Sequence, residues 1–360
     1  MHNRSLSLIA AVISTFTLLP AHADDAATGA DSTERLDTVL VTGTRGKART
    51  VLDSPVPVDV LTAADLKSAG ANSGELGQAL QTLLPSFNFP RQSNSGGADH
   101  VRAAQLRGMS PDQVLVLVNG KRRHTSAIVN DSSKIGRGTA PVDFNSIPIS
   151  AIKRIEVLRD GAGAQYGSDA IAGVINIILD DAPEGGEVST TYGAYHTREN
   201  AIGKRITDGQ SSRQRQMCIR DRFNSELPVG DYKAYSFGTY NERHTTGSDF
   251  YREASEHPEF YPNGYLPQSL GDNKDLSLTA GFKGMLDDDW DFDSSITHGR
   301  NRFDGSTQRT FNPSLGADSP TRFNTGDYEF RQTTTNLDLS REARLADRSF
   351  ILAVGGEYRY

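Results

Sequence analysis

The chain has 360 residues, of which 36% are apolar and 34 are glycine, and its mean hydropathy is −0.49. This composition is too polar for a helical membrane protein and poor in core residues for two compact soluble domains. The 38 basic and 45 acidic residues nearly balance, and a net charge of −7 without a basic face excludes general affinity for nucleic acid. The single cysteine, Cys218, excludes an intramolecular disulfide and a cysteine-based zinc site.

Residues 1–23 have the pattern of a secretory signal peptide. Arg4 precedes an apolar run from Leu6 to Leu19, and Ala21-His22-Ala23 is a small-x-small cleavage pattern. The run is too short for a spanning helix, and a buried core helix is the alternative interpretation. We therefore expect export and a mature chain that begins at Asp24.

Residues 24–47 combine a polar tail with a short extended segment. Residues 24–35 are small and polar without periodicity, whereas Leu36 to Arg45 is β-prone and has no partner strand close in the sequence. Such a segment suits strand addition to the sheet of another protein. The alternative is that it forms the first edge strand of the next domain.

Residues 48–182 have the pattern of a compact α+β domain. Helices are predicted from residue 62 or 63 to 69 and from 75 to 84, because Gly70 and Pro85 end them. The glycine-rich segment 160–167 has the wrong spacing for a dinucleotide loop and predicts a turn. The first predicted strand contains Pro57, which suits a sheet edge. The predicted strands are 56–61, 113–118, 152–157 and 173–179.

From residue 186 to residue 360, two-residue alternation replaces helical periodicity. Apolar and polar residues alternate in runs of about ten residues, as in 276–283 and 350–360. Short and long connections also alternate, which is typical of a transmembrane β-barrel. About seven strands are predicted, too few to close a barrel around a domain, so we expect the N-terminal part of a longer protein. The short connections lie near 228–231, 287–289 and 343–348, and the long ones near 244–273 and 302–331.

Several motifs resemble those of the TonB-dependent outer-membrane receptors, which are ligand-gated active transporters. Residues 37–43 resemble the TonB box, and residues 106–110 followed by 116–120 resemble the signature in the middle of the plug domain. Residues 155–161 and 165–178 resemble the long and specific signature at the end of the plug. The resemblance implies an all-β transmembrane barrel, 22-stranded in the family, with an N-terminal α+β plug in its lumen.

The resemblance also implies energy-coupled uptake of a scarce ligand, with a ferric siderophore as the default and cobalamin or an oligosaccharide as alternatives. The implied partners are TonB with its inner-membrane energising complex, the ligand and outer-membrane lipid. The family implies a monomer without a cofactor or an enzymatic activity. A passive pore, an adhesin barrel, a soluble periplasmic binding protein and a non-functional gene fragment are the other interpretations. The implied TonB-binding residues are Asp37, Thr38, Val39, Leu40, Val41, Thr42 and Gly43.

Two sets of plug residues are candidates for specific roles. The resemblance implies that Arg107 and Arg159 pair with barrel glutamates and lock the plug; the alternative is pairing with plug carboxylates such as Glu156. Polar plug loops are candidates for ligand contact, since basic side chains attract an anionic ligand, and the plug–barrel interface is their alternative location. No second ligand at a usual spacing supports a metal site. The ligand-contact candidates are Arg91, Gln92, Ser93, Asn94, His100, Lys121, Arg122, Arg123 and His124.

The segment 213–222 departs from the family pattern. A strand is expected there, but four arginines interrupt the alternation. A lipid-facing arginine at the bilayer midplane costs about 2–4 kcal/mol. The segment looks like a translated sequencing-adapter remnant, and the alternative is that its arginines face a polar lumen.

Overall fold

The computed structural model describes most of the chain after residue 56. The predicted signal peptide, the TonB-box segment 37–43 and the candidates Arg91 to Asn94 lie outside the described residues. Contacts divide the chain into Met1–Asp37 and Thr38–Tyr360, and all described residues belong to the second unit. Within the described part, no helix is long and apolar enough to cross a membrane. The described ranges are 57–69, 75–90, 96–131, 135–149, 152–159, 163–180, 187–199, 212–253, 258–287, 289–345 and 348–360.

A five-stranded sheet in the order β1-β6-β7-β4-β5 forms the centre of the plug. β4 and β7 are parallel, and the other neighbours are antiparallel. The first strand lies at an edge, as predicted from Pro57 at its start, which immediately precedes β1. The five strands are β1 (Val58–Thr62), β4 (Val114–Val118), β5 (Lys121–Arg122), β6 (Ile152–Leu158) and β7 (Gly173–Leu179), and a separate pair is β2 (Phe87–Asn88) with β3 (Gln105–Leu106).

The plug helices begin and end close to the predicted positions. In α1 (Ala63–Ser68), the Thr62 hydroxyl accepts from the Asp65 amide at 3.2 Å, and the Asp65 carboxylate accepts from the Thr62 amide at 2.8 Å. This capping box satisfies amides that the first turn leaves without partners. The α2 helix (Leu76–Leu83) buries Leu76 and Leu80. The predicted turn at 160–167 contains instead the short α3 (Gly163–Tyr166), and 3₁₀ helices occupy Gly96–Asp99, Pro111–Gln113, Phe144–Ser146, Ser168–Ala170 and Pro313–Asp318.

Both faces of the plug sheet are covered. In β4, Val114, Val116 and Val118 pack in the main core, whereas Leu115 and Leu117 pack in a smaller cluster on the opposite face. A strand buried on both faces reads as a continuous apolar run. The sequence Val-Leu-Val-Leu-Val therefore places β4 in the interior of the plug.

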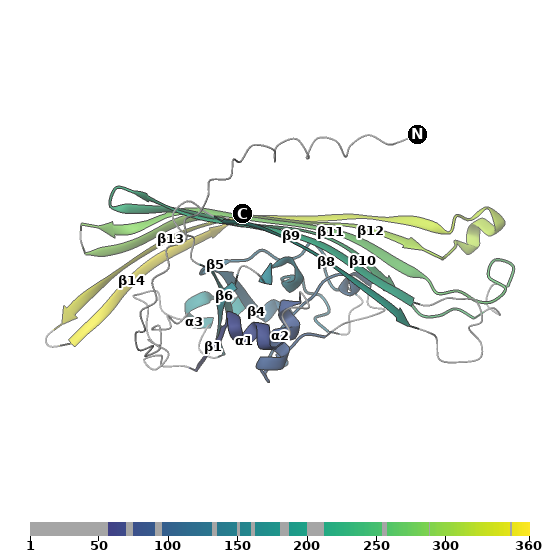
Figure 1. Cartoon of the computed structure of the whole chain (residues 1–360), viewed down its shortest axis with the longest axis horizontal. Coiled ribbons are helices and arrows are strands. Elements are labelled where there is room, and N and C mark those ends of the chain that lie inside the picture. Colours follow the sequence, from purple (N-terminus) through teal and green to yellow (C-terminus); the bar gives the residue numbers. More distant parts are fainter. Residues whose placement is uncertain are drawn as a thin grey trace, which may run out of the picture. The chain divides into compact units, whose positions relative to one another are not determined.

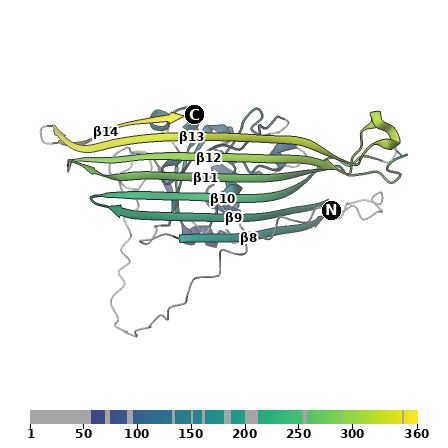
Figure 2. The same cartoon turned by 90° about the horizontal axis from the view of Figure 1, so that it is seen from above.

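Seven antiparallel strands follow in sequence order (Figure 2) and form the second sheet. The strands have 12 to 24 residues, so the predicted length of about ten was wrong. They are longer because charged residues within the predicted long loops continue the ladder, as at Asp272 opposite Asp304. The strands are β8 (Glu187–Glu199), β9 (Ser212–Val229), β10 (Tyr232–Ser248), β11 (Gln268–Leu286), β12 (Trp290–Gln308), β13 (Arg322–Leu345) and β14 (Arg348–Arg359).

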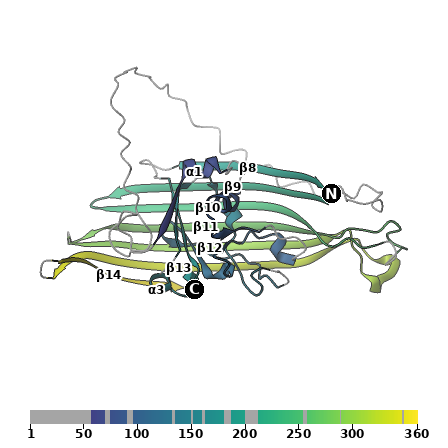
Figure 3. The same ribbon diagram turned by 90° about the horizontal axis from the view of Figure 1, so that it is seen from below.

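The two faces of this sheet differ in chemistry. Figures 1 and 3 show the plug against one face, which we call the inner face. On β11 the inner positions Asn273, Asp275 and Thr279 are buried, whereas Leu278 and Phe282 on the outer face are exposed. The long connections 249–267 and 309–321 both lie at one end of the strands, called here the long-loop end, and short turns lie at the other.

The arginine-rich segment does not interrupt its strand. β9 continues through it, and Arg220 and Arg222 are buried on the inner face. Arg220 Nε donates to the carbonyl of the plug residue Asn145 at 3.0 Å. For these two residues, the interpretation of arginines facing a polar interior is the one that the fold supports.

Candidate functional site

The edge strand β5 and the two residues after it, Arg123 and His124, present four side chains of basic type to the inner face of the second sheet. The preceding turn places Asn119 and Gly120 at φ 49° and 75°, a conformation that favours asparagine and glycine. Lys121 Nζ lies 3.0 Å from Asp293 Oδ1 on β12. Arg122 donates to Glu357 on β14 at 3.0 Å and to Asp169 in the plug at 2.6 Å. The segment therefore joins the plug to several strands by charge pairs.

Arg123 and His124 share one buried carboxylate. Arg123 Nη2 donates to Oδ1 of Asp275 on β11, and His124 Nε2 lies 3.0 Å from Oδ2 of the same residue. Burial lowers the pKa of His124 below its ordinary value, so the ring is neutral at pH 7. Its Nε2–H group donates a hydrogen bond to the Asp275 carboxylate. Asn301 Nδ2 donates to Asp275 Oδ2 at 2.8 Å and completes the shell of this carboxylate.

A second buried ion pair runs in the opposite direction. Here the arginine comes from the sheet, since Arg243 of β10 donates to Asp143 of the plug and to the carbonyl of His100, the latter at 2.5 Å. Arg243 is 1% exposed and Asp143 is 2% exposed. In these two pairs, plug and sheet thus each contribute one arginine and one aspartate, so each buried guanidinium has a carboxylate from the other side.

Glycines on the inner face seat the two plug histidines. A Cβ atom at Gly299 of β12 would lie 2.2 Å from His124 Nδ1, and one at Gly271 of β11 would lie 2.7 Å from His100 Nδ1. No side chain other than hydrogen fits between ring and strand at such distances. The two imidazole rings therefore pack directly on the backbone of β11 and β12, and they fix the position of the plug along the strands of the second sheet.

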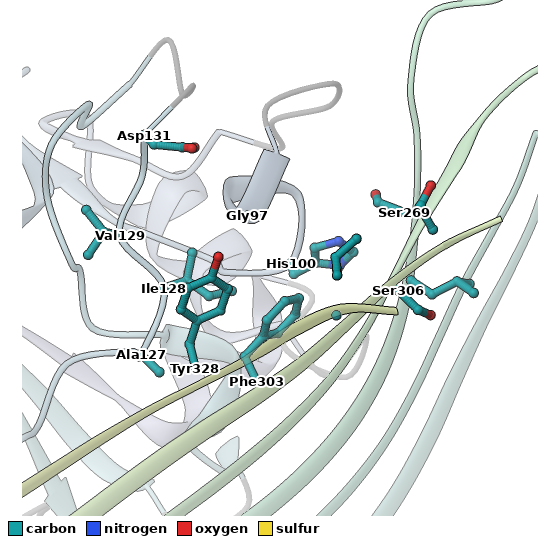
Figure 4. A pocket seen from close by; sticks show the side chains of 14 residues that line it. Gly97, His100, Ala127, Ile128, Val129, Asp131, Ser269, Phe303, Ser306 and Tyr328 are labelled. Atoms are coloured by element: carbon teal, nitrogen blue, oxygen red, sulfur yellow. The ribbon is translucent and has the colours of Figure 1, made fainter. Parts of the chain in front are cut away.

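A pocket of about 400 Å³ opens beside His100 at the long-loop end (Figure 4). His100 Nδ1 lies 2.5 Å from Thr245 Oγ1, and its ring centroid is 5.2 Å from that of Phe303. Burial, together with the nearby Arg243 and Arg102, lowers the pKa of His100 to about 4, so the ring is neutral at pH 7. The plug contributes Gly97, His100, Ala127, Ile128, Val129 and Asp131, and the sheet contributes Ser269, Leu270, Phe303, Gly305, Ser306, Thr307, Thr325 and Tyr328.

The lining combines aromatic rings and aliphatic side chains with hydroxyl groups. Phe303 and Ile128 pack in one apolar cluster, and both line the pocket together with Tyr328 (Figure 4). A mainly apolar concave surface with a few oriented polar groups is the usual character of a ligand site. Among the described residues, no group of histidine, cysteine, aspartate and glutamate side chains could hold a metal ion.

The sequence candidates lie in three places. His100 lines the pocket, whereas Lys121 through His124 are buried in the plug–sheet interface, the alternative location considered for them. Arg107 Nη1 donates to the carbonyl of Arg159 at 2.8 Å, and Arg159 pairs with Asp59. The ligand-contact and locking roles of these residues stay predictions.

The sheet partners Asp275, Asp293 and Arg243 were not singled out in the sequence. Asp275 and Asp293 occupy inner positions of β11 and β12, and Arg243 occupies an inner position of β10, where no alternating run was predicted. The available signal was a charged residue at a polar position of an alternating strand. Such a position faces the plug, where a charge is buried only together with a partner of opposite charge.

Comparisons with known proteins give one consistent result. The profile of the TonB-dependent receptor plug domain matches residues 50–174. The chain is 27% identical over 318 residues to the ferrienterobactin receptor of Escherichia coli, covering 84% of this chain and 38% of that protein. It is 33% identical over 165 residues to the vitamin B12 transporter BtuB of Vibrio vulnificus, covering 45% and 24%.

A solved structure supports the same fold. A variant of the ferric enterobactin receptor of Pseudomonas aeruginosa superposes with a TM-score of 0.50 at 16% identity, covering 86% of this chain and 49% of that one. The chain thus spans about half the length of this receptor and 38% of the Escherichia coli protein. The match includes the plug and the adjoining antiparallel strands.

Proposed function

Because the chain belongs to the TonB-dependent receptor family, whose members are transporters and not enzymes, we propose that it serves energy-coupled uptake of a scarce ligand across the outer membrane. The observation that carries this proposal is a plug held to a barrel wall by buried charge pairs, with a pocket between them. A passive pore or an adhesin has no use for such a plug.

The proposed ligand is a ferric siderophore, with cobalamin as the second candidate. The relatives named above comprise receptors for ferric enterobactin and a transporter of vitamin B12. We place the pocket beside His100 on the ligand side, because plug loops and strand ends converge there at the long-loop end. Long loops of outer-membrane barrels face the exterior.

Coupling to the energy source is proposed to use residues 37–43. In this mechanism the signal peptide 1–23 is removed, the chain inserts in the outer membrane of a Gram-negative cell, and ligand binding exposes Asp37 to Gly43 to the periplasm. TonB then adds a strand to Val39, Leu40 and Val41, since main-chain hydrogen bonds supply the affinity in this mode of recognition. Force on this segment displaces the plug from the wall.

The test is uptake of radiolabelled ferric enterobactin by cells that lack their own receptors for it. Deletion of residues 37–43 should reduce uptake to the level without receptor, as should a protonophore. Deletion of 26–32, an equally long piece of the polar tail, is the matched control and should leave uptake unchanged. Uptake that survives loss of residues 37–43 would contradict energy coupling, and a failure of ferric enterobactin with uptake of cyanocobalamin would change the ligand alone.

A further inference from the structure

The neighbours of His100 determine which of its two ring nitrogens carries the proton. His100 Nδ1 lies 2.5 Å from Thr245 Oγ1, and Thr245 Oγ1 lies 3.1 Å from the carbonyl oxygen of Gly271. A threonine hydroxyl has one hydrogen, whereas a carbonyl oxygen can only accept. The Thr245 hydroxyl therefore donates to Gly271, and its oxygen accepts a hydrogen bond from the Nδ1–H group of His100.

The second ring nitrogen of His100 is consequently a hydrogen-bond acceptor. A neutral imidazole has one N–H group, so Nε2 carries a lone pair when Nδ1 holds the proton. Nδ1 faces the second sheet, since a Cβ atom at Gly271 would lie 2.7 Å from it. Among the described residues, Nε2 has no hydrogen-bond partner, and it is not enclosed. His100 lines the pocket, so this lone pair is available to a ligand there.

Two further groups present acceptors to the same pocket. Thr307 Oγ1 donates to the carbonyl oxygen of Gln268 at 3.1 Å, so only its lone pairs are left for other partners. Asp131 contributes a carboxylate, which can only accept. The acceptors come from the plug and from β12, on the two sides of the pocket. The lining hydroxyl groups that can either donate or accept belong to Ser269, Ser306, Thr325 and Tyr328.

No cationic side chain is present among the described residues that line the pocket. The carboxylate of Asp131 is the one lining group in this set that is charged at pH 7, since the ring of His100 is neutral. Arg243 lies behind His100, but it is 1% exposed and donates to Asp143 and to the His100 carbonyl. An anion that entered the pocket would lose its water without gaining a cationic partner, which is unfavourable.

Apolar surface forms the rest of the pocket. The Phe303 ring lies 5.2 Å from the His100 ring, measured between centroids, and it packs in one cluster with Ile128. Aromatic and aliphatic surface binds the uncharged body of a ligand, and a few oriented polar groups select its orientation. The combination of apolar surface, acceptors and a single negative charge defines the chemistry of the group that fits.

We propose that the pocket selects an uncharged or cationic ligand group that carries N–H or O–H donors, and that His100 Nε2 accepts one of these hydrogen bonds. This inference rests on the proposed uptake function and narrows its ligand. Among ferric siderophores it favours neutral or cationic complexes, such as those of hydroxamates, over complexes that carry several negative charges. His100 and Asp131 are then residues that determine specificity.

Ferrioxamine B and two of its N-acyl derivatives test the charge preference, because all three share one ferric hydroxamate core. The parent compound carries an ammonium group, the N-acetyl derivative is neutral, and the N-succinyl derivative carries a carboxylate. Calorimetric titration of the detergent-solubilised full chain should give Kd values that rise in this order, by about tenfold from the cation to the anion. Equal Kd values, the reverse order or no binding of any of the three would overturn the proposal.

A cation introduced into the pocket should change this preference. The variant S306K should bind the N-succinyl derivative about tenfold more tightly than the variant S306Q, which has a similar size and no charge. Equal binding of this derivative by the two variants would contradict selection by charge. The titrations of the wild-type protein stand even if either variant fails to fold.

Variants of His100 test its role as an acceptor. H100F retains a planar ring without nitrogen and should weaken binding of the neutral derivative by about fivefold, because a ligand donor then loses its partner. H100Q supplies an amide oxygen near the position of Nε2 and should restore most of the affinity. An equal loss in the two variants would overturn the acceptor role of His100.

Binding in detergent separates this inference from the proposed function. Deletion of residues 37–43 should leave the order of the three Kd values unchanged, because binding requires no energy source. Loss of uptake with an intact order would overturn energy-coupled transport alone. Uptake by a protein that binds the three compounds equally would overturn the selectivity alone.

Discussion

The plug core and the plug–sheet interface are buried to similar degrees but consist of different chemistry. Ile155, Val157 and Ile175 are fully buried in the core, whereas the interface is held by Arg123 with Asp275 and by Arg243 with Asp143. Exposing apolar surface to water costs roughly 25 cal/mol per Å². Charged groups regain hydration when they separate, which offsets much of their lost attraction. Separating the plug from the second sheet in water therefore costs less free energy than opening the plug core.

Removing the shared carboxylate should have the largest effect on the interface. Asp275→Ala leaves Arg123 buried without its ion pair and takes the hydrogen-bond acceptor from His124, which should lower the free energy of unfolding by about 3–5 kcal/mol. Denaturant titration of the solubilised protein measures it. Asp272→Ala, on the exposed face of the same strand, should cost about 0–1 kcal/mol.

The double variant R123L/D275L sharpens this comparison. Apolar residues that replace both partners should recover most of the lost stability, because no buried charge then stays uncompensated. An equal loss in the single and double variants would show that packing, and not charge pairing, holds the plug to the wall.

The next effect is the pH dependence that His100 confers. Its folded-state pKa of about 4 lies below the ordinary value of 6.5, so the unfolded chain binds more protons between these values. Its contribution is complete above pH 6.5 and is lost as pH falls toward 4, which amounts to about 3 kcal/mol.

Denaturant titrations at pH 7 and pH 4 measure this loss. His100→Asn should reduce the difference in stability between the two pH values, and His244→Asn, with 42% of its side chain exposed, is the control. An unchanged difference in the His100 variant would assign the acid sensitivity to other groups, among which His124 shifts in the same direction.

The smallest of the three effects concerns the seat of His124. In Gly299→Ala the new methyl group would lie 2.2 Å from the imidazole, so the plug must shift, at a cost of about 1–3 kcal/mol. Gly356→Ala on β14 meets no atom within 4 Å and is the matched control. The thermal unfolding midpoint should fall in the first variant only; equal midpoints would mean that the ring moves aside freely.

The sequence analysis predicted local structure well and contacts across the interface poorly. Val114 to Val118 form an apolar run, and Thr62 with Asp65 forms a cap within three residues, so short-range patterns determined β4 and α1. Arg123 and Asp275 are 152 positions apart, and the residues around either one give no indication of its partner. Ligand candidates were chosen by polarity, and Lys121 is one of them. It lies in the interface because a carboxylate on the inner face, Asp293, attracts the same basic side chains that an anionic ligand would.

The plug contributes Arg123 to one buried ion pair and the second sheet contributes Arg243 to the other, so the charges of the two regions depend on each other. A plug with an acid at position 123 would bury two carboxylates against each other at Asp275, and a wall with an acid at position 243 would do the same at Asp143. Substitutions on one side are therefore tolerated only with compensating changes on the other. A chimera that combines this plug with the barrel of a relative should therefore assemble only where neither Arg123 nor Asp143 is left buried without a partner.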